Sequence, residues 1–459
     1  MLRPHPIPKA LLAQQDFFRE GNTLPVRSRL SVLRQIRLAV HAMEAEVLAA
    51  IAADIGKSSA EAYLGEVGLL YAEIRHMTKH LKRYAKPRAV RPMAGQLPAR
   101  AEVRPVPRGN VLIITPWNYP FSLALLPAVD AIAAGNTVII KPSEFAPTTA
   151  AVLKDLCERY LPQEWISVIP GDEAVSRALV EQPFHHIFYT GGGRVGGLIM
   201  QRAARRLIPV TLELGGKCPC IVAEDANIKL AAQRIIFGKF MNCGQTCVAP
   251  DHVYVHSTVR EELLREMEAT LLRFYGESPL DSPDYGRIIN RAHFDRLMAL
   301  LDGESPLVGG HARPDKLQIA PTIVEVTADS PLMEDEVFGP ILPVLTYDDL
   351  EVPIAGIRSL PTPLAFYLFS QDKSLQKRLM LQLPFGGGCV NDTLLHLCSP
   401  RLSFGGLGES GMGAYHGKAG FDTFSHQKSI LYQSGHIDLP LRYPPYSTLT
   451  ERLLRLVLR

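Results

Sequence analysis

The chain has 459 residues, of which 47% are hydrophobic and 21% charged, so it is long and apolar enough to form two or three packed domains. Its 49 basic and 46 acidic side chains nearly balance, which gives no reason to expect a nucleic-acid partner. Seven scattered cysteines without a CxxC pair exclude a disulfide framework and a zinc ribbon. No apolar run resembles a secretory signal or is long enough to cross a bilayer, so we expect a soluble, cytoplasmic protein without a metal site.

Short apolar runs alternate with helix-like stretches along the chain. Four early runs are apolar on both faces, as buried parallel strands are: 111–114, 137–140, 165–169 and 186–189. Helix-like stretches are predicted at 121–134, 146–160 and 194–207. Further strand candidates follow at 220–223, 252–256, 340–344, 365–370 and 387–391. This alternation predicts two successive α/β units that change near residue 213.

Two segments break the alternation. Residues 88–110 are rich in Pro and Arg and predict an extended arm rather than a core strand. The chain ends in LTERLLRLVLR, which places leucines and arginines at helical spacing. This helix either docks on the body or a partner subunit, or lies as a basic amphipathic segment on a membrane surface; it is too short to cross one.

A glycine-rich turn follows the run at 186–189. Gly191, Gly193 and Gly196 fit G-x-G-x-x-G, and Glu213 lies about 20 residues on, as in a dinucleotide fingerprint. Such a turn either binds pyrophosphate at a helix N-terminus or is only a tight connection. Glu213 lies in TLELGGK, at the end of an apolar strand, where it is either a salt-bridge partner or a buried general base with a raised pKa.

A pair of cysteines, Cys243 and Cys247, lies in the stretch FMNCGQTCVAP. The spacing alone leaves open a redox pair, half a metal site, core packing, or one nucleophile with a bystander. Four more motifs accompany this stretch: TPWNYP at 115–120, KPSE at 141–144, EVFGP at 336–340 and SFGGLGESGMG at 403–413.

Together, in this order and spacing, these motifs resemble the aldehyde dehydrogenase superfamily over about residues 10 to 435, and the segment 410–427 looks most like its class 3 branch. The resemblance implies an α/β fold with a Rossmann-like cofactor domain, a second α/β catalytic domain and a small extended oligomerisation arm. The implied division is a dinucleotide-binding domain at 1–87 and 104–213, a catalytic domain at 214–416, an arm at 88–103 and 427–441, and an amphipathic C-terminal segment at 442–459.

The resemblance implies NAD(P)-dependent oxidation of an aldehyde to a carboxylic acid. Cys247 would be the nucleophile that forms a thiohemiacetal and then a thioester. Asn118 and the N–H of Cys247 would form the oxyanion hole, and Glu213 would activate the water that hydrolyses the thioester. Cys243 becomes a small buried neighbour. The branch commonly forms homodimers, and the C-terminal segment adds a weak association with a membrane surface.

Cofactor roles carry over in the same way. Lys141 and Glu144 would contact the adenine ribose of NAD or NADP, and Glu336 the nicotinamide ribose, with Phe338 beside it. Thr115 and Trp117 belong to the same cofactor side. The turn with Gly191, Gly192 and Gly196 would approach the pyrophosphate, so Glu213 is not the ribose acid. Gly192 departs from the family pattern, since many members have Ser there.

Three other functions compete with this one. A CoA-acylating enzyme would intercept the thioester with a thiol, which the presence of Glu213 argues against. A binding protein of the same fold would lack activity. A thiol acyltransferase would use no nicotinamide.

Overall fold

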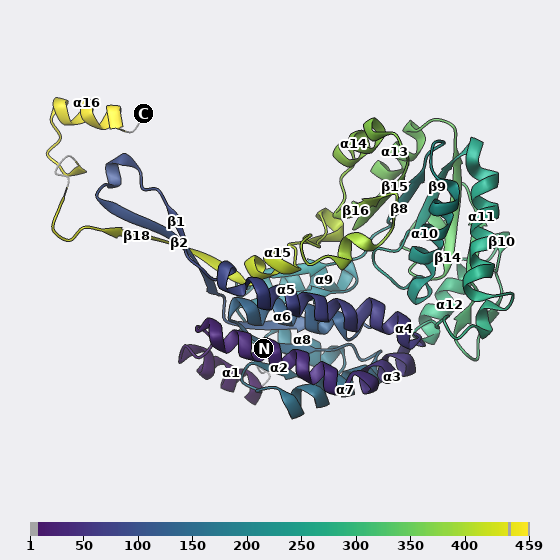
Figure 1. The fold of residues 1–459 in the computed structure, drawn as a ribbon, viewed down its shortest axis with the longest axis horizontal. Helices are drawn as coiled ribbons and strands as arrows, with labels where there is room; N and C mark the ends of the chain where they lie inside the picture. The colour runs from purple at the N-terminus through teal and green to yellow at the C-terminus, as the bar shows by residue number, and fades with distance from the viewer. Residues whose placement is uncertain (1–7, 439–441, 458–459) are drawn as a thin grey trace.

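A six-stranded sheet forms the centre of a first lobe in the computed structural model, which describes residues 8–438 and 442–457 (Figure 1). Its strands lie in the order β17-β7-β6-β3-β4-β5. Five of them are parallel, and β17 runs antiparallel to β7. The bounds are β3 Asn110–Ile114, β4 Thr137–Lys141, β5 Ile166–Val168, β6 His186–Thr190, β7 Val210–Glu213 and β17 Gly411–Met412.

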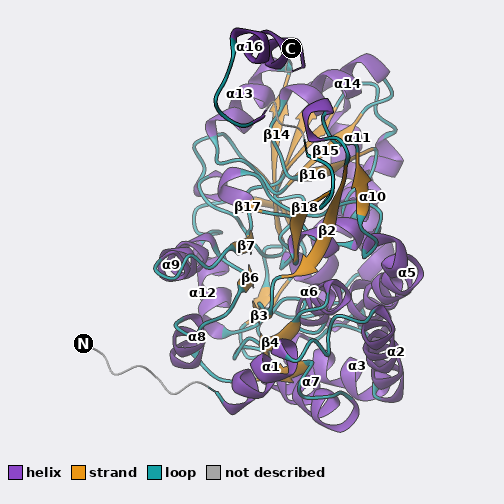
Figure 2. Cartoon of the chain, turned by 90° about the vertical axis from the view of Figure 1, so that its left-hand side faces the viewer, coloured by secondary structure: helices purple, strands orange, loops and turns teal. Residues whose placement is uncertain are grey.

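Helices cover both faces of this sheet, which explains why strands β3, β4, β5 and β6 are buried at every position (Figure 2). In β3, Val111 and Ile113 pack into the core with α2, α5 and α6, whereas Leu112 and Ile114 face the opposite core with α8 and α9. The first-lobe helices are α1 Lys9–Arg19, α2 Val26–Ala42, α3 Glu44–Ile55, α4 Ser59–Ala62, α5 Gly68–Tyr84, α6 Ser122–Ala134, α7 Pro147–Tyr160, α8 Glu173–Val180 and α9 Gly193–Ala204. A π-helical segment, Tyr63–Val67, joins α4 to α5.

A seven-stranded sheet forms the second lobe, in the order β10-β13-β14-β9-β8-β15-β16. All its strands are parallel except β10, which is antiparallel to β13. The strands are β8 Pro219–Val222, β9 His252–His256, β10 Pro306–Val308, β13 Thr322–Glu325, β14 Ile341–Tyr347, β15 Ala365–Phe369 and β16 Gly387–Val390; a separate ribbon pairs β11 Ala312–Arg313 with β12 Gln318–Ile319. The helices are α10 Ile228–Phe240, α11 Ser257–Tyr275, α12 Arg291–Ala299, α13 Glu351–Ser359 and α14 Lys373–Gln382.

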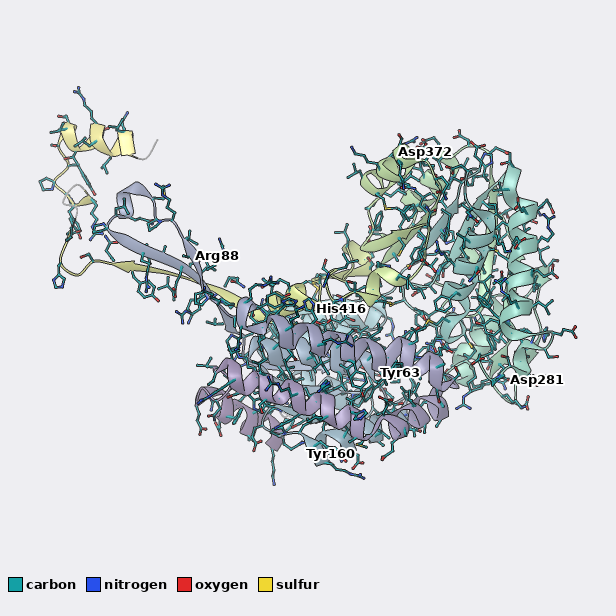
Figure 3. The ribbon with its side chains drawn as sticks, in the orientation of Figure 1. Tyr63, Arg88, Tyr160, Asp281, Asp372 and His416 are labelled. Carbon is teal, nitrogen blue, oxygen red and sulfur yellow. The ribbon has the colours of Figure 1, made fainter. Side chains whose placement is uncertain are left out.

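After the second lobe, the chain returns to the first lobe and then forms part of a projecting arm. Residues 411–412, which the sequence-based division places with the second domain, form β17 beside β7. His416 immediately precedes α15 (Gly417–Thr423), which packs on α5 and α6 (Figure 3). The arm is a three-stranded antiparallel sheet of β1 (Arg88–Val90), β2 (Ala99–Pro107) and β18 (Ser425–Gln433). It projects from the body, and α16 (Thr448–Val457) lies at its far end (Figure 1).

The α/β fold class is confirmed, and each predicted strand is present, although the run at 165–169 is shorter. The N–H of Trp165 donates to Pro162 O at 2.9 Å, so a turn occupies the start of that run before β5 begins. Residues 1–7, 439–441 and 458–459 of the implied domains lie outside the described residues. Within the two described ranges, no helix has the length and apolar content to cross a membrane.

Candidate active site

The site residues predicted in the first lobe gather at one edge of its sheet. Thr115, Trp117 and Asn118 follow β3, and Lys141 ends β4. Glu213 ends β7, and the glycine turn follows β6. Because these strands are parallel, their carboxyl ends share one edge, where open α/β sheets bind ligands.

The nucleophile candidate Cys247 follows a left-handed backbone turn after α10. Asn242, Cys243 and Gly244 have φ of 55°, 51° and 72°. A left-handed conformation costs a residue with a Cβ roughly 1–2 kcal/mol, although Asn tolerates it better than most. A Cβ on Gly244 would lie 2.1 Å from the carbonyl oxygen of Gly339, so the turn packs directly against the EVFGP segment.

The turn directs the two thiols into different surroundings. Cys243 is 2% exposed, and its thiol hydrogen-bonds Tyr285 in a core cluster of the second lobe. Cys247 is half-buried, and its carbonyl oxygen accepts a hydrogen bond from the Cys218 thiol at 3.3 Å. All seven cysteines are free thiols. Cys243 is therefore the small buried neighbour that was predicted.

The charges of two carboxyl groups act on the Cys247 thiol. Burial first, and then the charges of Glu336 and Glu213, raise the pKa of Cys247 to about 12, while the N–H groups of Cys247 and Val248 oppose this rise. At neutral pH the thiol is therefore protonated, and a base must remove its proton before it can attack.

Asn118 is fixed beside the nucleophile turn. Its side chain is 3% exposed, and its Nδ2 donates to Gln245 O at 3.0 Å, two residues before Cys247. A primary amide carries two N–H groups, so this bond uses one and leaves the other for a ligand.

Glu213 is a buried carboxyl group without a hydrogen-bond partner among the described residues. It is 2% exposed, and neither of its carboxylate oxygens is paired. Burial holds its pKa well above the usual range. Its main chain is held on both sides, because Gly191 N–H donates to Glu213 O at 3.0 Å and Gly411 pairs with it from β17. The group is a candidate base rather than a salt-bridge partner.

Glu336 lies against a glycine that leaves no space for a side chain. A Cβ on Gly215 would be 2.2 Å from Glu336 Oε2. Burial and the nearby Asp251 raise the pKa of Glu336 to about 8, whereas a hydrogen bond from Gly216 N–H opposes the rise.

A buried ion pair holds the loop that carries Glu336. Lys217 Nζ lies 2.5 Å from Asp251 Oδ2 and also donates to Leu332 O at 2.6 Å. The other oxygen of Asp251 accepts the N–H of Val337 at 2.8 Å. These bonds fix the backbone on both sides of Glu336.

The glycine turn after β6 presents a bare helix N-terminus. Gly191 has φ of 156°, and a Cβ there would lie 2.3 Å from the hydroxyl of Tyr189. Gly192 precedes α9 without any side-chain cap, and a Cβ at Gly192 would meet nothing within 4 Å. A Cβ at Gly196 would meet Leu214 at 2.9 Å, so this glycine allows the helix to pack closely. Free N–H groups at such an end bind anions.

The remaining cofactor candidates form three contacts. Lys141 is buried, and its Nζ lies 2.8 Å from Glu144 Oε2, whose side chain is 37% exposed. The rings of Trp117 and Phe338 meet edge to face, with centroids 5.5 Å apart. The Thr115 hydroxyl is turned toward its own chain, where it donates to the carbonyl of residue 116 at 3.1 Å.

Sequence reasoning missed a group of buried polar residues behind Asn118: Lys57, Glu66 and Asn242. The first two lie in a helical region without any motif, so no local signal could have identified them. Asn242 lies in the cysteine stretch, but only its left-handed φ and its bonds distinguish it.

Known proteins resemble this chain over most of its length. A model of the aldehyde dehydrogenase family matches residues 4–430. The 4,4'-diaponeurosporen-aldehyde dehydrogenase of Staphylococcus aureus is 45% identical over 433 residues, covering 94% of each chain. Aldehyde dehydrogenase family 3 member A2 of Mus musculus is 43% identical, over 96% of this chain and 91% of its own. A solved substrate-bound state of Staphylococcus aureus AldH superposes with a TM-score of 0.96 at 43% identity, covering 99% and 100% of the two chains.

Proposed function

The chain belongs to the aldehyde dehydrogenase family and is similar to its class 3 branch, and from that premise we propose that it oxidises an aldehyde to a carboxylic acid through a thioester on Cys247. One arrangement carries the proposal: Asn118 Nδ2 bonds to Gln245 O beside Cys247, and Glu213, whose carboxyl has no hydrogen-bond partner among the described residues, lies near enough for its charge to raise the pKa of the Cys247 thiol.

The first step is nucleophilic addition. The ionised form of Glu213, whose carboxyl oxygens have no hydrogen-bond partner among the described residues, accepts the proton of the Cys247 thiol and releases it to solvent before the hydrolysis step. The thiolate sulfur then bonds to the carbonyl carbon, and the carbonyl oxygen becomes negative. The free N–H of Asn118 and the main-chain N–H of Cys247 stabilise this oxyanion; removal of one such donor commonly costs about 100- to 1000-fold in kcat.

A nicotinamide cofactor fits the residues at the sheet edge. The open N-terminus of α9 suits a pyrophosphate, Lys141 ends β4 at the same edge of the sheet, and Glu336 lies in the loop before β14. Family membership supports such a cofactor, whose nicotinamide ring, when bound, accepts the hydride that leaves the tetrahedral carbon. The thioester that remains on Cys247 is then hydrolysed by water, which Glu213 deprotonates, and the sulfur leaves as thiolate.

The test is an assay of cofactor reduction with short, long-chain and aromatic aldehydes, with and without CoA. We expect CoA-independent reduction and a free acid as product. Cys247→Ala should abolish turnover; if it does not, the mechanism is wrong. CoA-dependent turnover would favour the acylating alternative, and a correctly folded protein that reduces no cofactor would favour a binding role. The name of the Staphylococcus aureus relative makes a long apolar aldehyde the first substrate to test.

The choice between NAD and NADP depends on the pair Lys141 and Glu144. Glu144 disfavours the 2′-phosphate of NADP by charge repulsion, whereas Lys141 favours it, and the two are bonded to each other. Glu144→Gln should therefore raise kcat/KM for NADP relative to NAD. An unchanged ratio would place the 2′ position elsewhere.

We also propose a cytoplasmic homodimer with a weak association at membrane surfaces. Free thiols throughout support a reducing compartment. The projecting arm presents unpaired strand edges to a second copy. The exposed Leu449, Leu456 and Arg455 of α16 support membrane binding, which deletion of residues 446–459 should weaken in a vesicle sedimentation assay.

A further inference from the structure

A buried ion pair lies behind the Asn118 loop, in a part of the first lobe that the proposed mechanism does not use. Lys57 Nζ and Glu66 Oε1 are 2.8 Å apart, and their side chains are 1% and 0% exposed. Lys57 lies between α3 and α4, and Glu66 lies in the π-helical segment. Removing two charges from water is costly, and the cost is offset only when further hydrogen bonds satisfy both groups.

Both members of the pair bond to the backbone of the loop that follows β3. Lys57 Nζ donates to the main-chain oxygen of Asn118 at 2.8 Å. Glu66 Oε2 accepts the N–H groups of Phe121 at 2.9 Å and Ser122 at 3.2 Å, where α6 begins. An anion is favoured at a helix N-terminus, so Glu66 fixes the end of the loop while Lys57 fixes its middle.

Asn242 connects the same carbonyl group to the nucleophile turn. Its Nδ2 donates to Asn118 O at 2.9 Å and to Gln245 O at 3.0 Å. The side chain of Asn118 donates to that same Gln245 O. Asn242 therefore bridges the two loops that carry Asn118 and Cys247.

We propose that Lys57, Glu66 and Asn242 are positioning residues, which hold the free N–H of Asn118 at a fixed distance from the Cys247 sulfur before the aldehyde binds. The inference rests on the proposed role of Asn118 in the oxyanion hole. A misplacement of about 1 Å at a reacting group can cost about 100-fold in rate. Loosening the bridge should therefore slow the chemistry, although none of the three side chains touches the reacting atoms.

Asn242→Gly is the most direct test. Glycine accepts a φ of 55° without strain, so the turn can keep its shape. Each carbonyl oxygen also keeps one donor: Asn118 O retains Lys57, and Gln245 O retains the Asn118 amide. We expect kcat and kcat/KM for the aldehyde to fall together by about 10- to 100-fold, with the KM for the cofactor unchanged.

Cys243→Gly is the matched control. It places glycine at the neighbouring left-handed position, with φ of 51°, but leaves the Asn242 bonds in place. We expect kcat/KM close to that of the unmodified enzyme. If Cys243→Gly lowers kcat/KM as much as Asn242→Gly does, the loss comes from increased backbone flexibility of the turn, and the proposal is overturned.

A second variant tests the bridge from outside the turn. Lys57→Met combined with Glu66→Gln removes both charges together and keeps an acceptor for the N–H groups at the start of α6. We expect the same fall in kcat/KM. The rate of Cys247 alkylation by iodoacetamide should stay within about twofold, because the nucleophile itself is unchanged. A folded double variant with full kcat/KM would overturn the proposal.

Combination with Asn118→Ala separates this inference from the proposed function. If Asn118→Ala alone leaves kcat/KM unchanged, the oxyanion role is wrong. If it lowers kcat/KM, Asn242→Gly should add no further loss in the Asn118→Ala background, because both changes act through the same amide. Additive losses would show that Asn242 acts elsewhere and would overturn the inference while the mechanism stands.

Discussion

Gly215→Ala should weaken cofactor binding by displacing Glu336. Gly215 is not in the left-handed region, so alanine is compatible with its backbone. The new methyl group would lie 2.2 Å from Glu336 Oε2 and 2.9 Å from the carboxyl carbon. The carboxylate must then move by about 1 Å to reach van der Waals distance.

The size of the effect follows from the bond that this movement breaks. If Glu336 holds a ribose hydroxyl, the displacement removes a hydrogen bond to a charged group, worth about 1.5–3 kcal/mol. This corresponds to an increase of about 10- to 100-fold in the Kd of the cofactor. The binding of aldehyde should change less, because the three atoms nearest to the new methyl group all belong to Glu336.

Calorimetric titration of the cofactor measures the Kd directly, and circular dichroism checks the fold. Gly435→Ala is the matched control, because a Cβ at that exposed position meets nothing. Glu336→Asp shortens the carboxyl arm, so Gly215→Ala should cost less in that background than alone. An unchanged Kd for Gly215→Ala would refute the assignment of Glu336 to the cofactor.

Three further predictions concern charge at the site. Lys217→Met leaves the buried Asp251 carboxylate without its cation and should lower the free energy of unfolding by about 3–5 kcal/mol in a urea titration. Adding Asp251→Asn should restore part of the lost stability, whereas full stability of the single variant would show that the ion pair does not stabilise the fold. Because the pKa of Cys247 is raised to about 12, its alkylation by iodoacetamide without cofactor should accelerate about tenfold per pH unit from neutral pH upward; a plateau near neutral pH would refute burial of the thiol. The pKa of Glu336 is raised from 4.5 to about 8, so the folded state binds this proton more tightly and stability falls as pH rises between those values. Glu336→Gln should flatten the fall in Tm across that window, and an equally steep fall would place the proton elsewhere.

The sheets could be predicted from the sequence because a strand that is buried on both faces appears as a short run of apolar residues. A run such as 111–114 is apolar at every position, as a parallel strand between two layers of helices is. The candidate site could be predicted from the sequence for a related reason. Lys141 and Glu213 end their strands, Asn118 lies in the loop that follows β3, and the carboxyl ends of parallel strands meet at one edge.

Contacts between segments far apart in the chain could not be predicted, because no local sequence pattern indicates them. Lys57 and Glu66 lie in a helical region, and neither residue type nor spacing indicates that both bond to the loop after β3. The different surroundings of Cys243 and Cys247 depend on a left-handed turn, which hydrophobic periodicity does not encode. The pairing of β17 with β7 joins residues about 200 positions apart, and a two-residue strand carries no periodic signal.

The position of β17 has a consequence for the biosynthesis of the protein. During translation, β7 leaves the ribosome long before residues 411–412 do, and until they arrive β7 is an edge strand with unpaired backbone groups next to Glu213. The arm strand β2 waits longer still for β18, because their paired residues lie further apart in the chain. A nascent chain can therefore fold most of its first lobe but cannot complete the edge that carries Glu213. The edge that carries Glu213 therefore stays incomplete until residue 412 has been synthesised.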